Sequence, residues 1–169
     1  MKKFLFSLST FLIFCTNSIS SEISTVDISF LLKNSNQGKS IEKKLENLNS
    51  KHLKKFQEKK KILETEEKKV SSKKNILSKE DFNKEVLKFK EKVKNYENER
   101  RKSSQEINDI KLKEIAKLLE KINKILIEYS NKNSISTVID KKNIIIIKKD
   151  NDITKDILKL FDDKYKKIK

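Results

Sequence analysis

The chain contains one glycine, Gly38, and no proline in 169 residues. Glycine and proline are the residues that most often interrupt helices and form tight turns. Beyond Gly38, neither residue type therefore interrupts a helix. A chain with so few sharp turns also has few ways to gather its many carboxylates into a pocket, which argues against an enzyme.

Residues 1–20 have the pattern of a secretory signal sequence. Two lysines precede an apolar run over residues 4–14, and Ser18 and Ser20 fit the small-residue positions of a cleavage site. The run is shorter than the about 20 apolar residues of a membrane span. Lipidation of Cys15 is disfavoured, because the preceding residue is phenylalanine where that processing needs a small one. The sequence predicts cleavage after Ser20 and export to the periplasm.

Few residue types suited to catalysis or metal binding remain after that cleavage. Cys15 is the only cysteine, so the mature chain has neither a disulfide nor a thiolate metal site. His52 is the only histidine, and on a lysine-rich helix we expect it to be a solvated or seam residue. The sequence therefore predicts no catalytic residue, no metal site and no cofactor.

The charge is strongly positive. Removing Lys2 and Lys3 from the formal net charge of +16 leaves +14, which suits an acidic partner or an anionic lipid surface. The basic residues are nearly all lysine, with Arg100 and Arg101 the only arginines. Lysines without arginine forks or interleaved aromatic residues are weak evidence for nucleic-acid recognition. We expect no specific nucleic-acid partner.

The N-terminal half predicts a strand followed by a long helix. Within residues 21–34, apolar and polar residues alternate from Ile23 to Phe30, which is typical of one strand of a base. A helical arm then covers residues 35–131. Its first helix is expected from about Ser40 to Lys74, with an apolar stripe of about one residue per heptad.

The arm turns near residues 75–81, where Ser78 and Asp81 form a capping box that opens a second helix. This helix should reach about Asn131 and measure about 80 Å, against about 55 Å for the first. Its apolar stripe widens beyond residue 115, so the overhanging end needs more than one neighbour. The expected seam positions of this helix are Phe82, Val86, Phe89, Val93, Tyr96, Ile107 and Ile110.

Residues 132–169 predict a β-hairpin and a short helix. Ile135–Asp140 and Ile144–Ile147 read as its strands, and the last helix has an apolar face formed by Ile153, Ile157, Leu158 and Phe161. The predicted fold is mainly α, a long antiparallel hairpin on a three-stranded β base. Three strands with open edges should not close a core in one chain, so the base should self-associate. The residues expected in that interface are Val26, Ile28, Val138, Ile139, Ile145 and Ile147.

Several short pieces, in this order, resemble the OmpH/Skp-like periplasmic chaperones over essentially the whole mature chain. The pieces are Val26-Asp27; Leu31-Leu32 with Ser35 and Gly38-Lys39; Ile76-Leu77-Ser78; Tyr96-Glu97 before Arg100-Arg101-Lys102; Val138-Ile139-Asp140; and Asp152-Ile153-Thr154. The resemblance implies a homotrimer whose strands form a central barrel carrying three arms. It also implies that unfolded outer-membrane proteins are held between the arms without ATP.

The resemblance further implies a lipopolysaccharide-binding cluster on the arm. Lys92 and Lys102 resemble two of its basic members, whereas Ser103 stands where another basic residue would be. Anionic lipid or lipopolysaccharide is therefore an expected partner.

Client contact is expected on apolar arm residues, namely Phe56, Leu63, Phe82 and Phe89. The same residues also fit a second interpretation, in which they form only the seam of the hairpin. Two other functions remain open, a periplasmic coiled-coil spacer or tether and a basic nucleic-acid-binding protein. The bare turn at the arm tip argues against a tether, and the signal sequence argues against the nucleic-acid protein.

Overall fold

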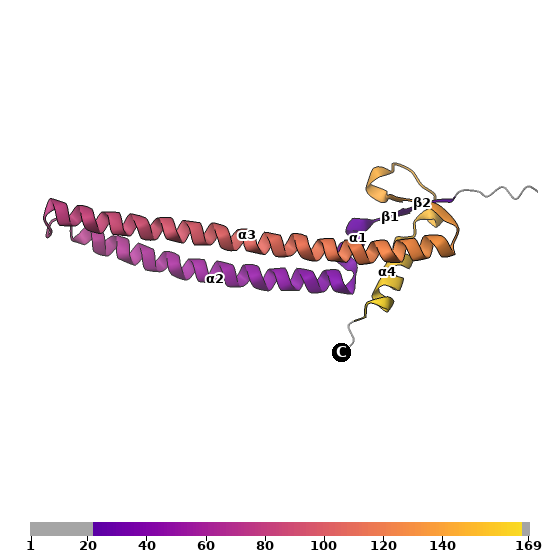
Figure 1. Cartoon of the computed structure of the whole chain (residues 1–169), viewed down its shortest axis with the longest axis horizontal. Helices are drawn as coiled ribbons and strands as arrows, with labels where there is room; N and C mark the ends of the chain where they lie inside the picture. Colours follow the sequence, from indigo (N-terminus) through magenta and orange to yellow (C-terminus); the bar gives the residue numbers. More distant parts are fainter. Residues whose placement is uncertain (1–21, 167–169) are drawn as a thin grey trace, which may run out of the picture.

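The computed structural model describes residues 22–166, and a long hairpin of two helices projects from a small base (Figure 1). The predicted signal segment, residues 1–20, lies outside the described residues. Helix α2 runs from Asn36 to Ser72 and helix α3 from Lys79 to Lys132, so the predicted helical arm is confirmed. The first helix begins before Ser40, because Ser35 caps it by accepting a hydrogen bond from the Gly38 N–H at 3.1 Å.

The turn at the arm tip has the capping chemistry that the sequence predicts. The Ser78 hydroxyl accepts a hydrogen bond from the Asp81 N–H at 3.1 Å and donates one to the Asp81 carboxylate at 2.7 Å. This contact satisfies one of the free N–H groups at the start of α3. Glu80 and Asp81 also place negative charge at the positive end of the helix dipole.

The seam between α2 and α3 contains the predicted stripe residues, all of which are buried or half-buried. Phe56 is the one arm residue of the seam that is fully buried, at 4% exposure. Its ring centroid lies 4.7 Å from that of His52 and 5.8 Å from that of Tyr96. Of the two positions expected for His52, solvated or in the seam, the structure shows the seam. A two-helix seam covers only one side of each helix, which leaves most of the arm surface in solvent.

Ion pairs connect the two helices along the arm. Lys44 pairs with Glu114 at 2.7 Å, Lys73 with Glu85 at 2.8 Å and Lys92 with Glu66 at 2.9 Å, and Lys59 also pairs with Glu99. Exposed pairs of this kind contribute little to stability, at most about 1 kcal/mol each. Because they link residues of opposite helices, they favour one register of the hairpin.

Among the described residues 22–166, the base contains two strands rather than the predicted three. Strand β1, Glu22–Val26, pairs in parallel with strand β2, Ile135–Asp140. The prediction that the first strand continues to Phe30 is wrong, because helix α1 occupies Ile28–Asn34. Asp27 ends the strand and caps α1 by accepting a hydrogen bond from the Phe30 N–H at 2.8 Å. A good N-cap residue thus prevails over the alternating pattern.

The predicted β-hairpin is also wrong. Residues 144–147 form no strand, and short 3₁₀ turns at Lys141–Asn143 and Lys149–Asn151 enclose this segment. Ile145 is 100% exposed, so a run of β-branched residues is not sufficient without a partner strand. On its other side β1 meets the chain before the last helix, where the Ile153 N–H donates to the Thr25 carbonyl at 3.0 Å.

One chain closes its own core, contrary to the prediction that self-association is needed for this. Helix α4, Thr154–Lys164, and helix α1 pack on the overhanging end of α3, so most of its apolar residues are covered within the chain, whereas Ile127 is 61% exposed. This is visible at the base in Figure 1. The predicted apolar face of α4 is confirmed. The core residues, all between 0% and 4% exposed, are Val26, Leu31, Leu118, Ile122, Ile125, Ile153, Ile157 and Phe161.

Gly38 is required by a close approach between α1 and α2. A Cβ atom at this position would lie 1.8 Å from the carbonyl oxygen of Leu32, far inside van der Waals contact. A hydrogen atom in place of the side chain therefore allows α2 to leave α1 at this angle. The single glycine of the chain sits at the joint between base and arm.

Candidate functional site on the arm

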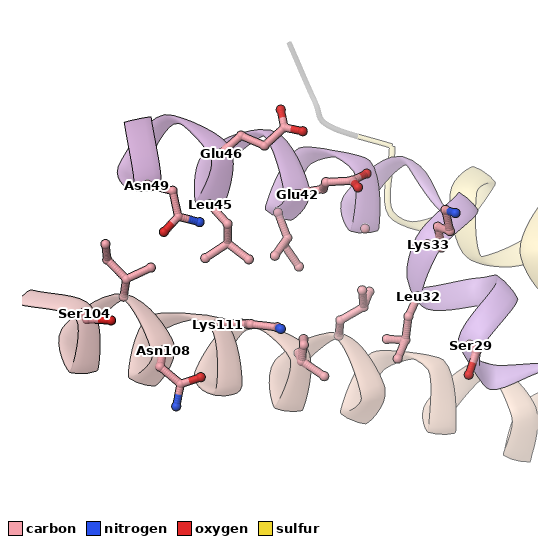
Figure 2. Close-up of a pocket in the computed structure, with 15 residues that line it drawn as sticks. Ser29, Leu32, Lys33, Glu42, Leu45, Glu46, Asn49, Ser104, Asn108 and Lys111 are labelled. Atoms are coloured by element: carbon pink, nitrogen blue, oxygen red, sulfur yellow. The ribbon is translucent and has the colours of Figure 1, made fainter. Parts of the chain in front are cut away.

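A cleft of about 710 Å³ opens at the root of the arm, where α1, α2 and α3 meet (Figure 2). Leu32 of α1 and Leu45 of α2 point into the gap between the helices, whereas Glu46 points away from it. The rim is polar and carries both signs of charge, for example Glu42 and Lys111. The apolar lining residues are Leu32, Ile41, Leu45, Ile107, Ile115 and Leu118. Such a surface suits apolar side chains of a partner.

The four predicted client-contact residues all lie in the seam. Phe56 is buried there, and Leu63, Phe82 and Phe89 are half-buried. Their positions agree with the interpretation that they hold the hairpin together. Contact with a client stays a prediction for the half-buried residues. The Phe56 ring is buried, so little of its surface is accessible to a client.

The apolar side chains that the arm does expose are different ones, which the sequence reasoning missed. They are 58–65% exposed and lie outside the heptad seam. The signal was present in the sequence, because each is a large aliphatic residue out of phase with the stripe on its own helix. A solvated helix face has no structural need for such residues. This group, the exposed arm aliphatics, consists of Leu53, Ile62, Leu87 and Leu112; Ile76 at the arm tip, at 79%, and Ile127 at the base end of α3, at 61%, are exposed as well.

The structure does not bring Lys92 and Lys102 together. Ten residues separate them on α3, which is about 15 Å along the helix. Lys92 is engaged by both carboxylate oxygens of Glu66 at 2.9 Å. The Ser103 hydroxyl lies 2.9 Å from Nδ1 of His52 in the seam, so position 103 does not face solvent freely. Lipopolysaccharide binding at these residues stays a prediction.

The six residues predicted for an oligomer interface have different environments. Val26 is in the core of the chain, and Ile28 and Val138 pack against that core. Ile139 and Ile147 are half-buried, and Ile145 projects fully into solvent. Within residues 22–166, β2 forms a sheet with β1 alone. The oligomer interface stays a prediction, and Ile139, Ile145 and Ile147 are its members outside the core of the chain.

A polar network in the base explains several of the residues that carry the family resemblance. The Asp27 N–H donates to Oγ1 of Thr154 at 2.9 Å, and that hydroxyl donates to Oδ1 of Asp152 at 2.5 Å. Lys141 Nζ lies 2.6 Å from the other Asp152 oxygen. Burial opposes ionisation of Asp152, but hydrogen bonds from Lys141 and Thr154 hold its pKa below the ordinary value. The hydrogen bond to Asp152 in turn raises the pKa of Lys141.

Two other features, a metal site and a membrane-spanning helix, were searched for in the described part of the chain and not found there. No three His, Cys, Asp or Glu side chains of residues 22–166 lie together as metal ligands would. Among the described helices, none combines the length and apolarity that crossing a membrane requires.

The fold defines a class of protein, a slender helical hairpin carried on a small mixed base, with apolar and basic surfaces along the hairpin. The chain belongs to the OmpH-like family: the family model described as outer membrane protein (OmpH-like) matches residues 22–161. This confirms the resemblance found in the sequence. No curated protein matches the chain.

A solved structure with a similar fold is that of an OmpH-like protein of Caulobacter crescentus, proposed to be an outer membrane chaperone. The TM-score is 0.78, and the match covers 87% of this chain and 87% of that chain. At 14% sequence identity, the likeness shows a shared fold.

Proposed function

We propose that this protein is an ATP-independent holding chaperone of the periplasm, which binds unfolded outer-membrane proteins and prevents their aggregation. The observation that carries the proposal is the arm itself, which projects far from the core and exposes large aliphatic residues outside its seam, the exposed arm aliphatics among them. Membership of the OmpH-like family supports it. Holding requires no chemistry, so we propose no catalytic residue.

Many weak contacts between the arm and an unfolded client would suit a holding function. An unfolded client exposes apolar segments and unpaired strand edges that aggregate unless they are shielded. The exposed arm aliphatics and the root cleft offer separate apolar contacts on one arm. Each half-buried aliphatic contact contributes only about 1 kcal/mol, so a client could bind at several places and still exchange. The excess of lysine would attract acidic clients over a longer range.

We further propose that the chain acts as a homotrimer, with the bases associated and the arms around a shared cavity. The small size of the sheet, which has two strands among the described residues, and the exposed Ile145 support self-association. A strand edge and an adjacent apolar run are the features that closed symmetric assembly covers. Because each chain already has its own core, association would add to a folded subunit rather than create one.

The direct test dilutes a urea-unfolded outer-membrane barrel protein into buffer with and without the purified protein, in the absence of ATP. We expect turbidity to rise more slowly when the protein is present. Equal rates of precipitation would refute the holding function. Precipitation at equal rates by a protein that is nevertheless trimeric would favour the spacer or tether instead.

The oligomer is tested separately by the molar mass from light scattering. We expect a trimer for the wild type and monomers for Ile145→Asp, because a charge on the exposed run disfavours its burial. Since Ile145 contacts no part of its own core, the variant should remain folded by circular dichroism. A trimeric Ile145→Asp variant would place the interface elsewhere.

A further inference from the structure

The first turns of α2 are packed more loosely than the rest of the hairpin root. Of the described residues between Gly38 and Phe56, none is fully buried. The cleft of about 710 Å³ separates this stretch of α2 from α3 (Figure 2). One ion pair, Lys44–Glu114, connects the two helices here, and an exposed pair contributes little to stability. Contacts outside the seam must therefore help to hold the start of α2 in place.

The last turn of α4 provides the first of these contacts. The Asp162 carboxylate accepts a hydrogen bond from the Asn36 N–H at 2.9 Å, although the two residues are 126 positions apart in the chain. This bond satisfies one of the N–H groups that are free at the start of a helix. It also ties the C-terminal helix of the base to the beginning of the arm, which lie near each other in Figure 1.

The next residue of α2 is held by both α3 and α4. The Gln37 side chain accepts a hydrogen bond from Lys121 Nζ at 3.0 Å and donates one to the Tyr165 carbonyl at 3.4 Å. Lys121 Nζ also lies 5.2 Å from the centroid of the Tyr165 ring, within the range of a cation–π contact. We call this group the root latch; it consists of Asn36, Gln37, Lys121, Asp162 and Tyr165.

We propose that the root latch is a conformational device that sets the width of the root cleft. When the latch is closed, it holds the start of α2 beside α3. When it opens, the root of α2 moves away from α3 about the joint at Gly38, and the buried Phe56 limits the movement at the outer end. Helix α3 does not move with α2, because Leu118 and Ile122 belong to the core of the base.

The chemistry of the latch suits reversible opening. Its contacts are polar and lie at the surface or are only half-buried, so water can replace each hydrogen bond. A hydrogen bond of this kind shifts an equilibrium by about fivefold. Elements that open in a folded protein are those with few buried apolar contacts, as at the root of α2. The inference does not depend on the holding function, since the width of the cleft is measured without a client.

The test measures distances between pairs of spin labels by pulsed electron paramagnetic resonance. Cys15 is the only cysteine, so a Cys15→Ser background accepts labels at chosen positions. Lys43→Cys and Lys113→Cys form the root pair, with one label on each helix beside the root cleft. Lys61→Cys and Lys94→Cys form the outer pair, farther along the arm. All four labelled positions are exposed.

The latch variant Gln37→Ala, Asp162→Ala should raise the ratio of long to short distances in the root pair about 25-fold, at about fivefold per substitution. The outer pair should keep its wild-type distance. The matched control Asn47→Ala, Asp163→Ala removes one amide and one carboxylate from exposed positions on the same two helices, and should leave both pairs unchanged. An unchanged root pair in the latch variant, or equal lengthening of both pairs, would overturn the proposal.

A single substitution separates the latch from a simple helix cap. Gln37→Ala keeps the bond between Asp162 and the Asn36 N–H, and it should still raise the ratio of long to short root distances about fivefold. Its helix content by circular dichroism should equal that of the wild type. An effect that requires Asp162→Ala would assign these contacts to capping of α2 and overturn the latch. Gln37→Ala also decides the matter if the double variant does not fold.

Discussion

The base and the arm of this protein are stabilised in different ways. In the base, eight buried residues from strand, loop and helices form one cluster, supported by the hydrogen bonds between Asp27, Thr154 and Asp152. Away from the base, where Leu118, Ile122 and Ile125 of α3 join the core, Phe56 is the one apolar side chain of α2 and α3 that is fully buried. This difference indicates that folding stability is concentrated in the base. In the arm, by contrast, several large apolar side chains remain accessible to solvent.

The largest expected effect is a cavity in the base core. Replacing Phe161 with Ala removes a ring that is 1% exposed and should lower the free energy of unfolding by about 3–5 kcal/mol. Urea denaturation followed by circular dichroism measures this change. The matched variant Phe56→Ala should lower it less, because two helices in solvent can close partly around the gap. Equal decreases in the free energy of unfolding for Phe161→Ala and Phe56→Ala would contradict a difference in stability between base and arm.

The joint between base and arm should respond next most strongly. Gly38→Ala introduces a Cβ at 1.8 Å from the Leu32 carbonyl oxygen, so the backbone of α1 or α2 must move. We expect a loss of about 3 kcal/mol, at the upper end for overpacking. Lys39→Ala, the neighbouring exposed position, is the control and should change stability by less than about 0.5 kcal/mol. A Gly38→Ala variant as stable as the control would show that the joint can relax.

The polar network of the base predicts a dependence on acid. The folded-state pKa of Asp152 is lowered, so its contribution to stability is present above the ordinary Asp pKa of about 3.9 and is lost as pH falls through the lowered value. Asp152→Asn should lower the free energy of unfolding at neutral pH by about 1.5 kcal/mol, the size of a charge-assisted hydrogen bond. The difference between variant and wild type should shrink as the pH falls below about 4. A constant difference at all pH values would contradict an ionised Asp152.

The elements predictable from the sequence were those with long periodic signals. The stripe from Phe82 to Ile110 and the capping box at Ser78 gave α3 nearly to the residue. The short strands failed because local patterns do not determine pairing. Alternation around Ile28 competed with the cap at Asp27, and the run 144–147 had β propensity but no partner.

The candidate site was predictable only in part, for related reasons. Seam positions follow from periodicity, so Leu63 and Phe89 were placed correctly between the helices. Asp27 and Thr154 are 127 residues apart, and only the fold shows that they share a hydrogen bond. The exposed arm aliphatics could not be identified from the heptad pattern, because that pattern selects only the apolar residues of the seam.

The variant with the smallest expected effect on stability tests whether the exposed arm aliphatics bind clients. Replacing all four exposed arm aliphatics with Gln keeps a similar helix propensity and removes side chains that are mostly in solvent, so each change should alter stability by less than about 0.5 kcal/mol. Holding should weaken if these residues contact clients, seen as faster precipitation of a urea-diluted outer-membrane barrel protein. The matched control carries Gln at the exposed polar positions Asn47, Ser50, Asn83 and Asn95.

The control should hold clients as the wild type does, because it removes no apolar surface. Undiminished holding by the four-residue variant would move client contact to the root cleft or to the half-buried seam. A loss of stability much larger than expected would instead show that the aliphatics contribute to the fold. The arm would then resemble the base, with its apolar residues serving packing, and the contrast between the two regions would fail.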